Sequence, residues 1–127
     1  MAATNYVTGY QHVGIPTNDM EATIAFYTAL GFTIKWETEN NGRVVFFEFG
    51  DIVIETYENG GKAAGVRGAI DHIALAVSDI EKTEEEIKKT GDPIVEGPCF
   101  LPFWENGVKY ICVKGPNTEI IEFLQKY

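Results

Sequence analysis

Four side chains of this sequence could together bind a divalent metal ion. Two of them, His12 and His72, are the only histidines in the chain of 127 residues. The others, Glu55 and Glu122, stand between apolar residues in segments predicted to be strands, where a carboxylate is costly to bury unless it is paired or bound to a metal. Two imidazole nitrogens and two carboxylate oxygens suit one divalent ion such as Ni, Co, Zn, Mn or Fe. Positions left open for water or substrate would make such a site catalytic.

The candidate ligands occur at matching places in an internal repeat. The segment 12–31 aligns without a gap with 72–91, at an offset of 60 residues (72 − 12). Glu55 and Glu122 correspond at an offset of 67 (122 − 55), because the second copy has a longer loop at 97–105. Taken singly, a strand histidine is more often structural and a strand glutamate is usually solvated. The recurrence of both residue types in both copies favours one shared site.

Each copy predicts a strand, a helix and three further strands. The fold class is therefore α+β, with two tandem βαβββ modules. We place the modules at 7–58 and 70–127, joined by a linker at 59–69, within a single domain of residues 1–127. Asn18 and Ser78 are the predicted helix N-caps, each with a glutamate three residues later. The predicted strands after the two helices are 32–38, 43–49, 51–57, 93–96, 108–113 and 118–124.

Side-chain alternation along the strands indicates where the histidines point. In the first strand, His12 shares a face with Gly14, while Val13 and Ile15 point to the other face. His72 stands in the same way among alanines, opposite bulky aliphatic residues. Because the bulky residues are expected to meet the helices, each histidine faces an open side with room for a ligand.

Composition excludes several classes of partner. The net charge is −9 and the sequence pI is about 4.6, so we expect neither nucleic acid nor an anionic membrane surface as a partner. No apolar run is long enough to cross a bilayer, and the first residues lack the pattern of an export signal. Cys99 and Cys112 are not spaced as a ligand pair and are predicted to be reduced thiols. We therefore expect a cytoplasmic protein that acts on a small molecule.

The chain resembles the vicinal oxygen chelate superfamily, which includes glyoxalase I, methylmalonyl-CoA epimerase, extradiol dioxygenases and the fosfomycin and bleomycin resistance proteins. The resemblance covers 12–124 and implies the glyoxalase-type fold, in which the two modules form a curved mixed sheet around a metal site. It also implies that the modules pair within one chain or swap between the chains of a homodimer. The set His, Glu, His, Glu is similar to that of glyoxalase I, the lactoylglutathione lyase. The motifs that carry the resemblance are His12-Val-Gly-Ile, Val53-Ile-Glu-Thr-Tyr, Asp71-His-Ile-Ala-Leu-Ala-Val and Gly115-Pro-Asn-Thr-Glu-Ile-Ile-Glu-Phe.

This resemblance implies a metal-dependent lyase or isomerase. Its substrate would be the hemithioacetal of a 2-oxoaldehyde and a thiol, and the reaction would pass through an enediolate whose oxygens are held by the metal. Glu122 would be the base that moves the proton, while His12, Glu55 and His72 remain metal ligands. An epimerase like methylmalonyl-CoA epimerase would use the same chemistry and is the alternative enzyme. A non-enzymatic binding protein similar to the bleomycin resistance proteins is a further alternative, which the complete ligand set disfavours.

Several other residues bear on the substrate. By resemblance, Asn59 matches an asparagine that contacts glutathione in the bacterial enzymes. Phe100, Phe103 and Trp104 belong to the longer loop of the second copy, where they either wall an apolar pocket or pack together. Pro16 stands where those enzymes have an arginine that binds a glutathione carboxylate, so the identity of the thiol stays open. The candidate replacements for that arginine are Arg43, Arg67 and Lys109.

Overall fold

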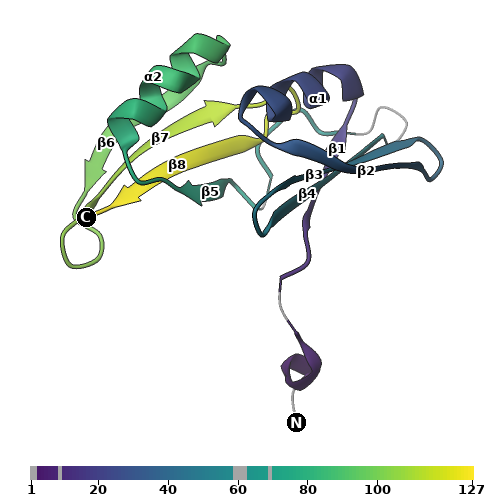
Figure 1. The fold of residues 1–127 in the computed structure, drawn as a ribbon, viewed down its shortest axis with the longest axis horizontal. Helices are drawn as coiled ribbons and strands as arrows, with labels where there is room; N and C mark the ends of the chain where they lie inside the picture. Colours follow the sequence, from purple (N-terminus) through teal and green to yellow (C-terminus); the bar gives the residue numbers. More distant parts are fainter. Residues whose placement is uncertain (1–2, 9, 59–62, 69) are drawn as a thin grey trace.

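The computed structural model describes residues 3–8, 10–58, 63–68 and 70–127. The chain forms two consecutive βαβββ modules, and each module packs one helix against a four-stranded mixed sheet (Figure 1). Both helices lie on the same side of the molecule, whereas the N-terminal segment with the short helix η1 (Ala3–Tyr6) projects away on the other side. The predicted α+β class and the tandem modules are confirmed, with the strands divided between two sheets. The predicted linker 59–69 lies partly outside the described residues.

In the first module, the sheet has the order β1-β4-β3-β2, and β1 runs parallel to β4. This pairing sets Gly14 beside Glu55, so His12, just before β1, lies toward the start of β4. The elements are β1 (Val13–Thr17), α1 (Met20–Ala29), β2 (Thr33–Glu39), β3 (Arg43–Phe49) and β4 (Ile52–Glu58).

The second module repeats this arrangement. Its sheet has the order β5-β8-β7-β6, with β5 parallel to β8 and Ala74 set beside Glu122. Ala74 corresponds to Gly14 in the repeat, so both modules bring the same strand position next to a glutamate. The elements are β5 (Ile73–Ala76), α2 (Ile80–Thr90), β6 (Ile94–Leu101), β7 (Val108–Lys114) and β8 (Ile120–Lys126).

The long loop predicted at 97–105 is partly a strand. β6 continues to Leu101 through two shifts in its pairing with β7, on either side of Glu96. Gly97 has a positive φ of 86°, and a Cβ there would collide with the carbonyl oxygen of Tyr110. Glycine therefore lets the strand bend and continue where a hydrophobicity pattern indicates that it stops.

The helix N-caps lie one residue later than predicted. Asp19 and Asp79 are the caps, because each carboxylate accepts the backbone N–H three residues later at 3.0 Å. The side chain of Asn18 instead donates to the carbonyl oxygen of Ala63 and accepts from its N–H, at 3.2 and 3.1 Å. The side chain expected to cap the first helix thus holds the segment between the modules.

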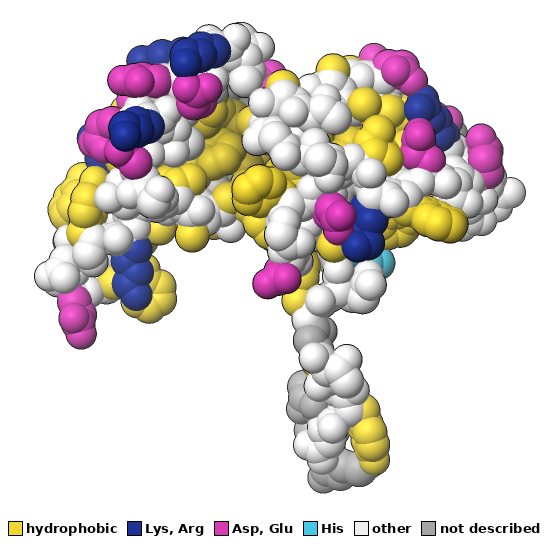
Figure 2. Space-filling view, viewed as in Figure 1, with side chains coloured by type: hydrophobic (Ala, Val, Ile, Leu, Met, Phe, Trp, Pro, Cys, Tyr) yellow, Lys and Arg dark blue, Asp and Glu magenta, His cyan; other side chains and the backbone are white. Residues whose placement is uncertain are grey.

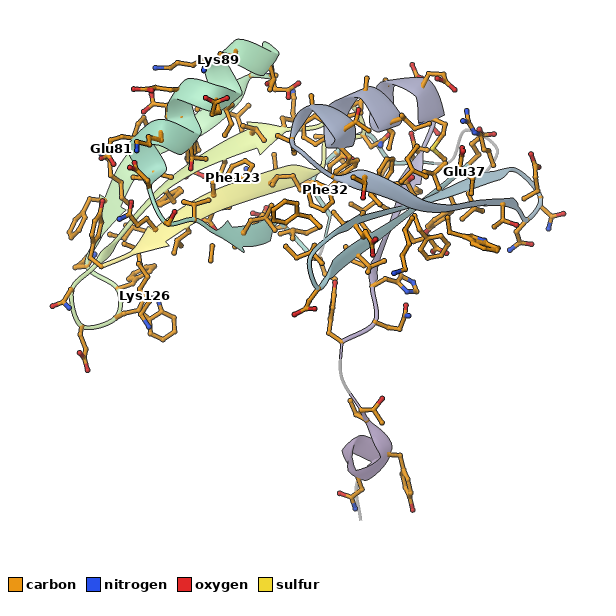
Figure 3. The ribbon with its side chains drawn as sticks, in the orientation of Figure 1. Phe32, Glu37, Glu81, Lys89, Phe123 and Lys126 are labelled. Carbon is orange, nitrogen blue, oxygen red and sulfur yellow. The ribbon has the colours of Figure 1, made fainter. Side chains whose placement is uncertain are left out.

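One hydrophobic core joins the two modules. Its fully buried members include Tyr27 and Phe47 from the first module and Ile111 and Ile121 from the second. Phe32 and Phe123, labelled in Figure 3, belong to the same core and lie where the two halves meet. The relative position of the modules is therefore set by apolar packing.

Buried polar contacts reinforce this junction. The Tyr27 hydroxyl on α1 donates to Glu119 of the second module at 3.1 Å. Asn117 donates from its side chain to the Thr23 hydroxyl at 2.9 Å and from its backbone to Glu119 at 2.7 Å. Burial, and then the Glu119 carboxylate, raise the pKa of Tyr27 well above its usual value, so the phenol stays protonated and remains a donor.

Charged side chains of both signs gather over α2 (Figure 2). Lys88 pairs with Glu84 at 2.8 Å and Lys89 with Glu86 at 2.7 Å along this helix. Such exposed pairs keep the outer face of the helix solvated and contribute little to folding. Neither α1 nor α2, nor any other helix in the described part of the chain, is long and apolar enough to cross a membrane.

Candidate metal centre

The first module brings His12 and Glu55 together. The His12 Nε2 atom lies 3.8 Å from Glu55 Oε1, and the ring meets Phe46 edge-on with centroids 5.8 Å apart. Val13 and Ile15 pack against the core on the other side of β1, as the alternation predicted. We call His12 and Glu55 the first half-site.

The second module forms an equivalent pair from His72 and Glu122, the second half-site. His72 Nε2 lies 3.2 Å from Glu122 Oε2. Ile73, opposite His72, packs against the core. The Glu122 side chain is only 12% exposed, whereas that of His72 is 42% exposed. The carboxylate therefore lies at the floor of the half-site and the imidazole at its rim.

The two half-sites do not join within one chain. Among the described residues, which include all four candidate ligands, no three His, Cys, Asp or Glu side chains gather closely enough to hold one metal ion. One chain therefore offers two separate pairs, each with one imidazole and one carboxylate. Each pair supplies half of the predicted ligand set.

The separation of the two side chains in a half-site can be compared with that of two ligands of one ion. Nitrogen and oxygen ligands about 2.1 Å from a metal, at angles of about 90° to 110°, lie about 3.0–3.4 Å from each other. The separation of 3.2 Å in the second half-site lies within this range, whereas that of 3.8 Å in the first half-site is longer. In the second half-site, His72 lies between two carboxylates, with Asp71 Oδ2 2.9 Å from Nδ1 and Glu122 Oε2 3.2 Å from Nε2. A divalent ion bound by Nε2 and Glu122 would leave the ring proton on Nδ1, where Asp71 would accept it.

A residue just before each histidine holds its other ring nitrogen, a feature that the sequence analysis missed. Gln11 Oε1 lies 2.5 Å from His12 Nδ1, and Asp71 Oδ2 occupies the same position at His72. Arg67 Nη2 donates to the same Asp71 oxygen at 2.6 Å. The hydrogen bonds from His72 and then Arg67 hold the pKa of Asp71 below its usual value. The only sign of this role in the sequence is that Gln11 and Asp71 each stand immediately before a candidate histidine ligand.

Cysteine does not add a thiolate to the second half-site. Cys112 is paired with Glu122 across β7 and β8, and its side chain is buried. Burial, followed by Glu122 and Glu96, raises the pKa of the Cys112 thiol to about 12. The thiol is therefore protonated at neutral pH. Cys99 and Cys112 are both free, as predicted.

One residue predicted to contact substrate is not described by the structure, and the other three lie at the end of β6 and in the loop after it. Asn59 is outside the described residues. The ring of Phe100 lies over Gly107 and Phe103 is exposed. Trp104 is 70% exposed, and Lys126 (Figure 3) lies over its ring at 4.6 Å. The hollow of about 430 Å³ that Trp104 lines contains none of the four candidate ligands, so a role for these aromatic residues in substrate binding stays a prediction.

Of the three candidate cations, only Arg67 lies near a half-site. Arg43 bonds to Glu21 of α1 and Lys109 to Glu81 of α2, at 2.8 Å for the second pair. Both are thereby held on the helix side of the sheets, away from the histidines. Arg67 instead reaches the second half-site through Asp71.

A larger hollow lies beside the first half-site. Its volume is about 710 Å³, and aromatic side chains from β2 and β3 form much of its wall. No sequence pattern assigned these aromatic residues to a site. The lining residues are Tyr10, Gln11, Lys35, Trp36, Phe46, Asp51 and Val53.

Comparison with known proteins agrees with the fold. Residues 9–117 match the family described as the Glyoxalase/Bleomycin resistance protein/Dioxygenase superfamily. The chain belongs to this superfamily, many of whose members are enzymes and some of which are not.

Two relatives and one solved structure illustrate the range of the family. The chain is 36% identical over 124 residues to YwbC of Bacillus subtilis, covering 91% of this chain and 95% of that protein. It is 32% identical over 124 residues to a protein of Vibrio cholerae named "Probable lactoylglutathione lyase", covering 90% and 88%. The fosfomycin resistance protein FosX from Listeria monocytogenes, solved with Mn(II) and sulfate, has a TM-score of 0.71 at 14% identity, covering 95% and 94%.

Proposed function

We propose that this protein is a metal-dependent lyase or isomerase of the glyoxalase I type. Its substrate is the hemithioacetal of a 2-oxoaldehyde and a thiol, which it converts to a 2-hydroxyacyl thioester. The observation that carries the proposal is the paired His and Glu in each module, at matching register in the two sheets. The name of the Vibrio cholerae relative supports the same activity.

The proposed site is shared between two chains. The first half-site of one chain and the second half-site of its partner together supply two imidazoles and two carboxylates, and a homodimer contains two such sites. In support, the half-sites of one chain stay apart, although each holds one imidazole and one carboxylate close together, at 3.8 and 3.2 Å. A twofold dimer uses the same pair of surfaces twice, so both sites are equivalent.

The proposed reaction moves one proton between neighbouring carbons. A bound divalent ion supplies a Lewis acid that stabilises negative charge on the two substrate oxygens. Glu122 takes the proton from the carbon that carries sulfur and returns it to the adjacent carbonyl carbon, while a second proton passes between the two oxygens. The substrate is neither oxidised nor reduced overall. Because its side chain is only 12% exposed, Glu122 is shielded from exchange with bulk water.

The surroundings of the half-sites bear on the substrate class. Trp36 and Phe46 line the hollow beside the first half-site, which suits an apolar group of the substrate. Pro16 brings no charge to bind a glutathione carboxylate. Arg67, near the second half-site, is already paired with Asp71. A thiol compound with fewer carboxylates than glutathione, such as cysteine, is therefore included among the substrates to be tested.

Turnover with defined thiols tests the proposal. Protein loaded with Ni²⁺, Co²⁺, Zn²⁺ or Mn²⁺ is given methylglyoxal together with glutathione, cysteine or coenzyme A, and thioester formation is followed by its ultraviolet absorbance. We expect turnover with at least one thiol, lost after chelation of the metal and regained when metal is added back. Absence of thioester with every metal and thiol would contradict the proposal and leave the epimerase and the binding protein as alternatives. Exchange of the α-proton of an acyl-CoA with deuterated solvent would then separate those two.

A further inference from the structure

We propose that Asp71, held in place by Arg67, is a positioning residue that orients the ring of His72 through Nδ1 and so directs its Nε2 atom toward the metal. This inference rests on the proposed metal centre. It concerns residues that make no contact with the ion themselves.

The contacts form a short chain from the linker to the second half-site. One oxygen of Asp71, Oδ2, accepts from Arg67 Nη2 at 2.6 Å and from His72 Nδ1 at 2.9 Å. A carboxylate only accepts hydrogen bonds, so when a metal takes the lone pair of Nε2, the single ring proton lies on Nδ1 and Asp71 accepts it. Nε2 faces the other proposed ligand of this half-site, Glu122, at 3.2 Å. This arrangement of carboxylate, histidine and metal is a general means of orienting a ligand and raising its basicity.

Asp71 is not itself a candidate ligand for the same ion. It binds Nδ1, and the two nitrogens of an imidazole point in diverging directions. An ion bound at Nε2 is therefore out of reach of the Asp71 oxygen that accepts from Nδ1. The contribution of Asp71 is orientation and electron donation through the ring.

The first module uses the same position with different chemistry. Gln11 Oε1 lies 2.5 Å from His12 Nδ1, so the residue before each histidine contacts the same ring nitrogen. Gln11 is neutral, however, and Asp71 carries a charge that Arg67 holds in place. We therefore infer that the second half-site contains the more strongly donating imidazole and is the tighter metal-binding half.

Exposure of the three side chains argues against a purely structural role. Arg67 and Asp71 are 45% and 49% exposed, and His72 is 42% exposed. An ion pair with this exposure contributes little to the free energy of unfolding. Removal of Asp71 is therefore expected to leave the fold intact, so that an effect on His72 can be measured.

The Nδ1 proton of His72 is the first test, on protein labelled with ¹⁵N and saturated with Zn²⁺. The metal would hold Nε2, so the ring proton lies on Nδ1, and its rate of exchange with water reports whether an acceptor holds it. We expect a slowly exchanging Nδ1 proton in the wild-type protein and in Asp71→Asn, whose amide oxygen still accepts. In Asp71→Ala this proton is expected to exchange much faster, and His12 provides an internal control because Gln11 is unchanged. Equal exchange rates in Asp71→Ala and in the wild type would overturn the inference.

Metal affinity, measured by competition with a chromogenic chelator for Zn²⁺ or Co²⁺, is the second test. We expect binding about 10- to 100-fold weaker in Asp71→Ala, with a smaller loss in Asp71→Asn and in Arg67→Met. The matched controls are Glu86→Ala and Lys89→Met, which break an ion pair of similar exposure on α2 and are expected to change nothing. Wild-type protein that binds no metal contradicts the proposed function. Wild-type binding that Asp71→Ala leaves unchanged contradicts only the role of Asp71.

Discussion

Mixing the His12→Ala and His72→Ala proteins is expected to restore an activity that neither has alone. In a shared site, each variant homodimer lacks one imidazole at both of its centres. A mixed dimer has one centre with both defects and one with none, because His12 and His72 of that centre come from different chains. With random exchange of chains, half of the dimers are mixed and half of their centres are intact, so about one quarter of wild-type activity should return.

The mixture of His12→Ala with Glu55→Ala is the matched control. Both substitutions lie in the first half-site, so every centre of a mixed dimer carries one defect and no activity should return. Exchange of chains is verified by giving one variant an affinity tag and isolating mixed dimers. No recovery in isolated mixed dimers of the His12 and His72 variants would show that the ligands of a working site come from one chain.

Glu122→Gln is expected to lower turnover by about 10³-fold at saturating metal. General base catalysis contributes about 10²- to 10⁴-fold, and the amide has no carboxylate to accept the substrate proton. The substitution keeps the shape of a side chain that is almost buried beside His72, so the fold should tolerate it. Turnover and bound metal are measured on the same samples, because Glu122 is both a proposed ligand and the proposed base.

Glu55→Gln separates these two roles. Glu55 holds the equivalent position in the first module. Glu55→Gln therefore removes a carboxylate ligand of the metal without removing the proposed base. We expect both variants to bind metal more weakly, while only Glu122→Gln remains nearly inactive once metal is saturating. Equal turnover in the two saturated variants would exclude Glu122 as the base.

The fold could be predicted because its information is local and occurs twice. The match between 12–31 and 72–91 predicted two equal units, and the structure sets Gly14 beside Glu55 and Ala74 beside Glu122. The face of each histidine followed from alternation, since the bulky neighbours of each one had to meet the core.

Features that depend on contacts between distant parts of the chain could not be predicted from these local patterns. Alternation assigns a side chain to a face of its own sheet, but the distance between half-sites depends on how the two modules pack. That packing uses contacts such as Tyr27 with Glu119, which join residues far apart in the sequence. The length of β6 depends on the fit of Gly97 against the backbone of Tyr110. The position of each helix N-cap depends on which of two adjacent polar residues binds the first turn of the helix. The contact of Asp71 with His72 depends on side-chain rotamers, which periodicity does not report.

The number of metal ions per chain, together with the number of imidazoles bound to each ion, tests the shared centre most directly. Metal content is measured on saturated dimer, and X-ray absorption of bound Zn²⁺ or Co²⁺ gives the count of histidine ligands. We expect one ion per chain with two imidazoles, because each ion joins a first and a second half-site. Two ions per chain with one imidazole each would show that the half-sites bind metal separately, and the shared centre would then be wrong.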